Sequence, residues 1–291
     1  MIDPSIKKEV EYAHRVLAEN KTKEEFISNT NKLLKGIKKE RPRDLTRFFN
    51  WRIEDVLDLG FFLTVKENNY NHLNDAYYTY SRLSYFDSEY YSRKKREKSI
   101  LEEDKPVFNS IISARAANDD ALVNLLLENS NPLKFLRSKY CTSYTNIILG
   151  IELEDENKIN QGIIDAEELL NQKLTIYEKH KAEMLLSIAK KDIEKLNKAL
   201  QDAIDTYTFY ISRQQMDYLY RYLPIHILGL IKIAEKYIGS NFYNDFKVPE
   251  SKIWYPEWFS LIKKGKTGKR FMSFTGEASY LNEMIDTLEV L

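Results

Sequence analysis

Histidine and carboxylate side chains are the first candidates for chemistry in this sequence. Glu11 and His14 stand three residues apart, the spacing found at the di-iron sites of helical bundles, but such a site needs this motif twice and two further carboxylates. The sequence holds no second copy. His180 and Glu183 have a related spacing and could share a metal ion, yet no third ligand lies near them. We therefore expect no metal site and interpret each of the four histidines as a half-buried helical residue.

Neither a nucleophile nor a nucleotide-binding loop is indicated. Cys141 is the single cysteine, and its apolar neighbours favour a small buried residue over a reactive thiol, which would need an electropositive setting and a base. Gly265, Lys266 and Thr267 match the end of a phosphate-binding motif, but Ser260 stands where that motif requires glycine. We expect a protein that is not an enzyme and has no cofactor.

A short basic segment around the same glycines allows two interpretations. Residues 263–270 contain five cations among eight residues, and Phe271 and Phe274 follow them. Cations next to aromatic side chains are typical of a loop that binds phosphate groups. The alternative is a solvated surface turn, and we favour this second interpretation.

Acidic side chains are in excess in one part of the chain. Residues 151–205 carry 13 acidic residues and 8 lysines. The densest cluster lies at a predicted junction between two helices and consists of Glu152, Glu154, Asp155 and Glu156. Such a cluster would speed the encounter with a basic partner, so these four residues are candidates for partner binding. The alternative is a solvated outer helix face.

Tyrosines are concentrated between residues 70 and 91. Leu73, Tyr77 and Tyr80 share one face of a predicted helix, and this face is expected to pack inward. Tyr78, Tyr85 and Tyr91 lie off that face, and the three cannot all be buried together if only one face is covered. They are therefore further candidates for partner binding, since tyrosine combines a large contact area with few rotamers. Core packing is the alternative for most of the tyrosines.

The elements that position these residues are predicted to be helices. Glycine and proline are scarce, at 9 and 7 residues, and apolar residues recur at helical spacing along nearly the whole chain. The fold class is therefore all-α, with serial antiparallel helical hairpins that form an α-solenoid-like or curved multi-helix bundle. We expect an N-terminal region at 1–104 and a C-terminal hairpin region at 105–291, packed as one continuous unit. Trp51 is expected to lie in the core of the first region.

The overall composition limits the compartment and the partners. Lys plus Arg and Asp plus Glu are both 44, so no global field favours nucleic acid or an anionic membrane, and we expect no direct nucleic-acid binding. No apolar run approaches the length of a membrane span. A single cysteine and a polar N-terminus predict a reducing, cytoplasmic location. These features are compatible both with a monomer and with a homo-oligomer.

The second half of the chain resembles a known family. The order of its segments between residues 105 and 260 is similar to that of the immunity protein family forty-nine of bacterial polymorphic toxin systems. The similar segments are Ala114–Asp119, Lys179–Asp192, Leu223–Ala234, Val248–Pro249 and Trp254–Trp258. The family often has a histidine in the helix before the Leu-Pro element, where this chain has Thr206, Tyr207 and Tyr210. Residues 1–100 show no such resemblance.

The resemblance implies a mostly helical, non-catalytic bacterial protein that binds and neutralises a cognate toxin. An acidic face would suit a nuclease toxin, whose substrate groove is basic. A helical-repeat adaptor or regulatory scaffold that holds a partner in its groove is the alternative from a different class. A helical enzyme or a nucleic-acid-binding protein is a third alternative, for which the sequence offers no constellation of polar residues.

Overall fold

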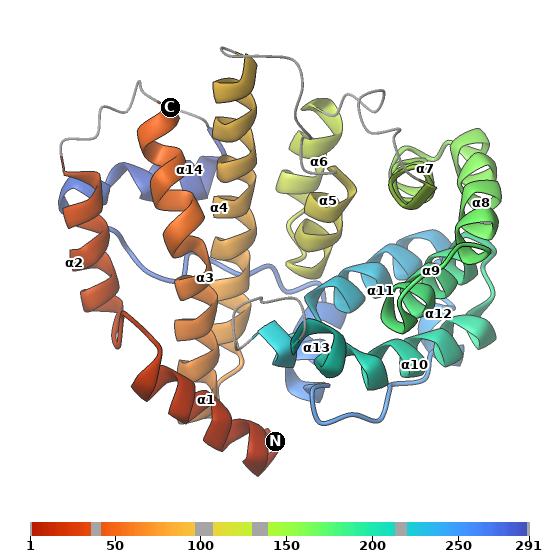
Figure 1. Ribbon diagram of the computed structural model, residues 1–291, viewed down its shortest axis with the longest axis horizontal. Coiled ribbons are helices and arrows are strands. Elements are labelled where there is room, and N and C mark those ends of the chain that lie inside the picture. The colour runs from red at the N-terminus through yellow and green to blue at the C-terminus, as the bar shows by residue number, and fades with distance from the viewer. Residues whose placement is uncertain (1, 36–41, 97–106, 130–138, 213–219, 290–291) are drawn as a thin grey trace. The chain divides into compact units, whose positions relative to one another are not determined.

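The all-α class predicted from the sequence is confirmed. The computed structural model describes residues 2–35, 42–96, 107–129, 139–212 and 220–289, without the side chains of 42–52, 88–96, 107, 129, 139, 212 and 220. These residues form fourteen α-helices and two 3₁₀ turns, and no strand occurs among them (Figure 1). The predicted core residue Trp51 lies in a helix, but its side chain is outside the described residues, so its role stays a prediction.

The chain divides into two compact units. One unit comprises residues 1–104, 117–122 and 255–291, and the other comprises 105–116 and 123–254. The division after residue 104 coincides with the predicted boundary, but the prediction of a single C-terminal region is wrong. Residues 255–291 pack with the N-terminal unit because their apolar side chains complete the core of that unit, as described below for the tyrosines.

The first unit is built on one long helical hairpin. Its helices are α1 (Pro4–Val16), α2 (Lys23–Leu34), α3 (Pro42–Glu67), α4 (Asn71–Arg96), α13 (Pro256–Lys263) and α14 (Tyr280–Thr287). The side chain of Asp3 caps α1 by accepting from the Ser5 amide at 2.8 Å, and Thr22 caps α2 in the same way. Helices α3 and α4 lie side by side along most of their length, so each covers an apolar face of the other (Figure 1).

The second unit consists of successive helices joined by short turns. Its helices are α5 (Val107–Ala116), most of α6 (Asp120–Asn129), α7 (Lys139–Leu153), α8 (Glu156–Leu170), α9 (Ile176–Ala189), α10 (Ile193–Ser212), α11 (Ile225–Ile238) and α12 (Phe242–Asp245). Helices α7 and α8 form one hairpin, and α9 and α10 form the next. Thr175 and Glu178 form a reciprocal capping box at the start of α9. The solenoid-like stacking of such hairpins stays a prediction.

Helix α11 lies at the centre of the second unit, and a glycine permits its close packing. A Cβ atom added at Gly229 would lie 2.1 Å from the backbone oxygen of Ile112 in α5. Alanine in a helix interior is normally about 1 kcal/mol more favourable than glycine. Here the methyl group would collide with backbone, which cannot rotate away as a side chain can.

We therefore expect Gly229→Ala to lower the free energy of unfolding by about 1–3 kcal/mol, the usual cost of overpacking a core. Urea denaturation of the two proteins measures this difference. An increase in stability would show that α5 and α11 separate easily and that their close approach contributes little.

Candidate functional site

The predicted acidic cluster separates into a buried residue and exposed ones. The Glu152 side chain is 0% exposed, and its carboxylate accepts hydrogen bonds from Arg115 at 2.5 and 2.7 Å and from Lys236 at 2.6 Å. Arg115 comes from α5 and Lys236 from α11, so this triad links three helices of one unit. Glu152 is thus a structural residue, which corrects its interpretation as part of an exposed binding face.

The other three carboxylates of the cluster form the turn between α7 and α8. Asp155 caps α8 by accepting from the amides of Asn157 and Lys158, both at 3.1 Å. Glu154 and Glu156 are exposed, and neither has an ion-pair partner among the described residues. Leu153, directly before them, is 50% exposed. The turn therefore presents an apolar side chain next to two uncompensated negative charges.

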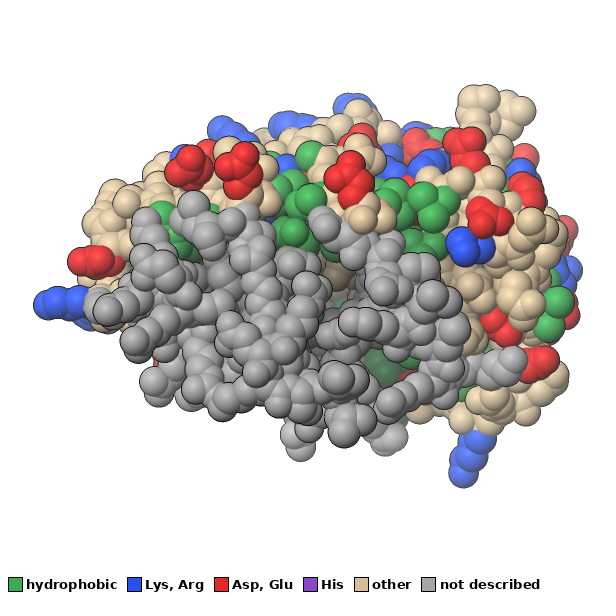
Figure 2. Space-filling model, turned by 90° about the horizontal axis from the view of Figure 1, so that it is seen from above, with side chains coloured by type: hydrophobic (Ala, Val, Ile, Leu, Met, Phe, Trp, Pro, Cys, Tyr) green, Lys and Arg blue, Asp and Glu red, His purple; other side chains and the backbone are tan. Residues whose placement is uncertain are grey.

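Most of the remaining acidic excess does not form a continuous negative face. Glu167 pairs with Lys190 at 2.6 Å, and Asp165 is buried and accepts from Asn146 at 3.0 Å. On the described part of the face in Figure 2, acidic and basic side chains are interspersed. Glu154 and Glu156 are exposed carboxylates that lie close together in the sequence, at the turn between α7 and α8.

Two of the three candidate tyrosines are buried, which corrects their interpretation as surface residues. Tyr78 is 8% exposed and Tyr85 is 5% exposed, while the side chain of Tyr91 lies outside the described residues. Exposure was predicted for them on the expectation that only one face of this helix is covered. In the structure, residues 255–291 return to α4 and cover a second face of it. The Phe271 amide, for example, donates to the hydroxyl of Thr79, the residue next to Tyr78.

The basic segment 263–270 is exposed along most of its length, as the favoured interpretation predicted, while its backbone is held in place by contacts with α4 and Asn118. The Lys269 amide donates to Asp75 at 3.1 Å, and the Thr267 hydroxyl donates to the Asn118 carbonyl at 2.8 Å. A Cβ atom at Gly268 would lie 2.5 Å from the Cβ atom of Tyr78. The glycine is thus required for close packing. Phe271 and Phe274, which follow the segment, are buried.

The histidines and the cysteine lie apart from one another. His14 is buried and stacks on Phe62 with ring centroids 3.5 Å apart, and His72 pairs with Glu67 at 2.7 Å. Among the described residues, no group of three or more His, Cys, Asp or Glu side chains could hold a metal ion. Cys141 is partly exposed, whereas burial was expected.

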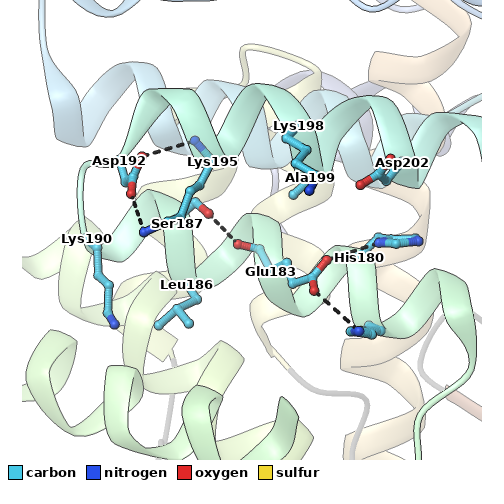
Figure 3. A pocket seen from close by; sticks show the side chains of 11 residues that line it. His180, Glu183, Leu186, Ser187, Lys190, Asp192, Lys195, Lys198, Ala199 and Asp202 are labelled. Atoms are coloured by element: carbon cyan, nitrogen blue, oxygen red, sulfur yellow. Dashed lines mark hydrogen bonds and ion pairs between the residues drawn. The ribbon is translucent and has the colours of Figure 1, made fainter.

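A pocket of about 470 Å³ lies between α9 and α10 (Figure 3). Its lining is mostly charged and comprises Lys179, His180, Glu183, Leu186, Ser187, Lys190, Asp192, Lys195, Lys198, Ala199 and Asp202. The Glu183 carboxylate lies between the His180 ring at 3.1 Å and the Lys179 ammonium at 3.9 Å. A hydrogen bond and the charge of Lys195 lower the pKa of Asp192 at the other end of the pocket.

The pocket contains serine, histidine and glutamate, but their arrangement is not that of a nucleophilic site. The Ser187 hydroxyl donates to the backbone oxygen of Glu183 at 2.7 Å, whereas activation would require it to donate to the His180 ring. The paired charges instead suit contact with polar side chains of a partner.

Arg115, Lys236 and the buried Lys181 carry no signal in the sequence that marks their roles. Arg115 and Glu152 are 37 residues apart, and Lys236 follows Glu152 by 84 residues. No local pattern could have indicated these contacts.

Comparison with known proteins leaves the resemblance untested: no family model, no curated protein and no solved structure matches this chain. The resemblance of residues 105–260 to the immunity protein family therefore stays a prediction. Within the described residues, every helix is too short or too polar to cross a membrane.

Proposed function

We propose that this chain acts without catalysis, by binding another protein, and that the partner is a toxin that it neutralises. The observation that supports binding is the turn between α7 and α8. There, the half-exposed Leu153 adjoins the exposed and unpaired carboxylates of Glu154 and Glu156. The toxin as partner is inferred from the resemblance of residues 105–260 to the immunity protein family.

This turn has the physical properties of a small binding site. Burying the exposed part of Leu153 against a partner would remove apolar surface from water, at about 25 cal/mol per Å². The two carboxylates would steer a basic partner and speed its association. Because Asp155 holds the backbone of the turn by capping α8, little conformational entropy would be lost on binding.

The proposal predicts that reversing these two charges slows association. We expect the double substitution Glu154→Lys and Glu156→Lys to lower the association rate with the toxin encoded beside this gene by roughly tenfold at low salt. High salt should largely abolish the difference, because it screens exposed charges. Asp155 stays unchanged, because replacing it would also remove the helix cap. Surface plasmon resonance at two salt concentrations measures the rates.

The matched control reverses Glu194 and Asp205, two exposed carboxylates of α10 in the same unit. It changes the net charge by the same amount and should leave the association rate nearly unchanged. If both pairs of substitutions slowed association equally, the effect would come from net charge and not from this turn. If the substitutions at Glu154 and Glu156 left the rate unchanged, the interface would lie elsewhere.

The pocket between α9 and α10 supports the second candidate, a helical adaptor. Its volume suits a few side chains of a partner peptide, and its paired charges offer donors and acceptors to them. Co-expression with the neighbouring toxin separates the two candidates. Survival of the cells supports neutralisation, whereas a phenotype that depends on this chain without any toxin gene nearby supports an adaptor.

A further inference from the structure

Lys181 in α9 is a buried cation without a counter-ion. Its residue is 8% exposed, and its ammonium group donates to the Tyr140 hydroxyl at 3.2 Å. No carboxylate forms an ion pair with it among the described residues. Glu178, one turn earlier on the same helix, is engaged with Thr175 in the capping box. Burying an ammonium group without a negative partner is costly, so this position requires an explanation.

Aromatic rings offset only part of the free-energy cost of burying the Lys181 charge. The ammonium of Lys181 lies 5.4 Å from the ring centroid of Tyr177, 5.7 Å from that of Tyr140 and 5.9 Å from that of Tyr144. These contacts are near the outer limit of about 6 Å for cation–π attraction. Burial raises the pKa of Tyr144 and of Tyr177, so both phenols remain protonated and neither supplies a negative charge.

Two further polar atoms in the same cluster are buried and incompletely paired. The Nδ1 atom of His226 has no hydrogen-bond partner, and the hydroxyl of the fully buried Tyr144 lies near that of Tyr140 without a hydrogen bond of standard geometry. Burial, and secondarily the charge of Lys181, lowers the pKa of His226 to about 3, so its ring is neutral. Unpaired buried polar groups are uncommon in folded proteins and require an explanation, of which a bound ion is one.

The N-terminus of α11 is a fourth feature, after Lys181, Tyr144 and His226, that would favour a bound anion. His226 is the second residue of this helix, and Pro224 at the cap position makes no side-chain hydrogen bond to the first turn. The backbone amides of an uncapped helix N-terminus, together with the helix dipole, favour negative charge. One anion could pair with the ammonium group, accept hydrogen bonds from the hydroxyl and the ring nitrogen, and lie favourably at the helix terminus.

We propose that Lys181, Tyr144 and His226 form a binding site for a small oxyanion, a carboxylate or a phosphate group. The anion pairs with the Lys181 ammonium and accepts from the Tyr144 hydroxyl and from a ring nitrogen of His226. Tyr140 and Tyr210 contact the rings of this cluster and are only partly buried. The site does not depend on the proposed toxin binding, because none of its residues belongs to the turn between α7 and α8.

Thermal unfolding with defined anions tests this site, because a ligand that binds only the folded state raises the unfolding midpoint. The wild-type protein is titrated with sodium phosphate and, separately, with sodium acetate, against sodium chloride at equal ionic strength. We expect one of the two oxyanions to raise the unfolding midpoint above the value measured in sodium chloride. Phosphate alone would identify a phosphate group as the ligand class, and acetate alone would identify a carboxylate.

Two conservative substitutions assign the effect to these residues. Lys181→Met removes the charge at similar volume and should abolish the response, while Tyr144→Phe should weaken binding roughly tenfold or more, the loss of one charge-assisted hydrogen bond. Lys173→Met, at an exposed lysine between α8 and α9 that lies outside both this site and the pocket, is the control and should respond like the wild type. The imidazole ¹⁵N resonance of His226 is assigned by its absence from the spectrum of His226→Gln. In the wild type, this resonance should shift when the active anion is added.

The proposal is overturned if neither oxyanion exceeds chloride in the wild type. It is also overturned if Lys181→Met responds as the wild type does, or if the His226 resonance does not move while the midpoint rises.

Discussion

Replacing Asp119 with alanine is expected to lower the free energy of unfolding by about 3–5 kcal/mol, the cost of removing one partner of a buried ion pair. Asp119 is buried, and its two carboxylate oxygens accept from Arg82 at 2.7 and 2.9 Å. Arg82 is equally buried and also donates to the carbonyls of Ile285 and Asp286 in α14. Without Asp119, the guanidinium would remain buried with only neutral partners.

The same carboxylate has a second role. It accepts from the Leu122 amide at 3.1 Å and so caps the first turn of α6. The contact with Arg82 explains why residues 117–122 belong to the first unit although the flanking residues belong to the second.

Two further variants separate the charge from the cap. Asp119→Asn keeps an acceptor for the amide and should cost less than Asp119→Ala. The double variant Arg82→Leu and Asp119→Ala should recover part of the loss, because no unpaired charge remains. Urea denaturation measures all three variants. A loss below about 1 kcal/mol for Asp119→Ala would contradict the assigned role, since that is the size of an ordinary substitution.

A loss of about 3–5 kcal/mol is likewise expected for Glu152→Ala in the second unit. This substitution would leave Arg115 and Lys236 without their shared carboxylate. Burial by itself would raise the pKa of Glu152, but the hydrogen bonds and charges of Arg115 and Lys236 outweigh it, and the pKa is lowered. Stability from this group is therefore fully present above its usual pKa of 4.5 and is lost as the pH falls through the lower value of the folded state.

The pH dependence of the free energy of unfolding provides a second test of this prediction. Below about pH 4.5, the free energy of unfolding of the wild type should fall more steeply with acidification than that of Glu152→Gln, which cannot ionise. Glu154→Gln, at an exposed carboxylate without an ion pair, should follow the wild type. Parallel curves for the wild type and Glu152→Gln would mean that the triad contributes no pH-dependent stability.

The sequence alone was sufficient for the features that depend on near neighbours. These features include the helix starts after Asp3 and Thr22 and the helix end at Gly239, which cap residues and apolar spacing indicate locally. This was possible because capping and helical hydrogen bonds join residues within about four positions of each other. The all-α class follows from the same local signals.

Tertiary structure alone decided which chemically capable side chains are exposed. Glu152 and Glu154 are two residues apart in one acidic cluster, yet one is buried between Arg115 and Lys236 while the other faces solvent. Tyr78 is buried because residues about 190 positions later return to cover it. Burial and pairing depend on contacts between residues far apart in the chain. A local pattern can therefore show that a residue is able to bind or ionise, but not whether its partner is solvent, another side chain or a ligand.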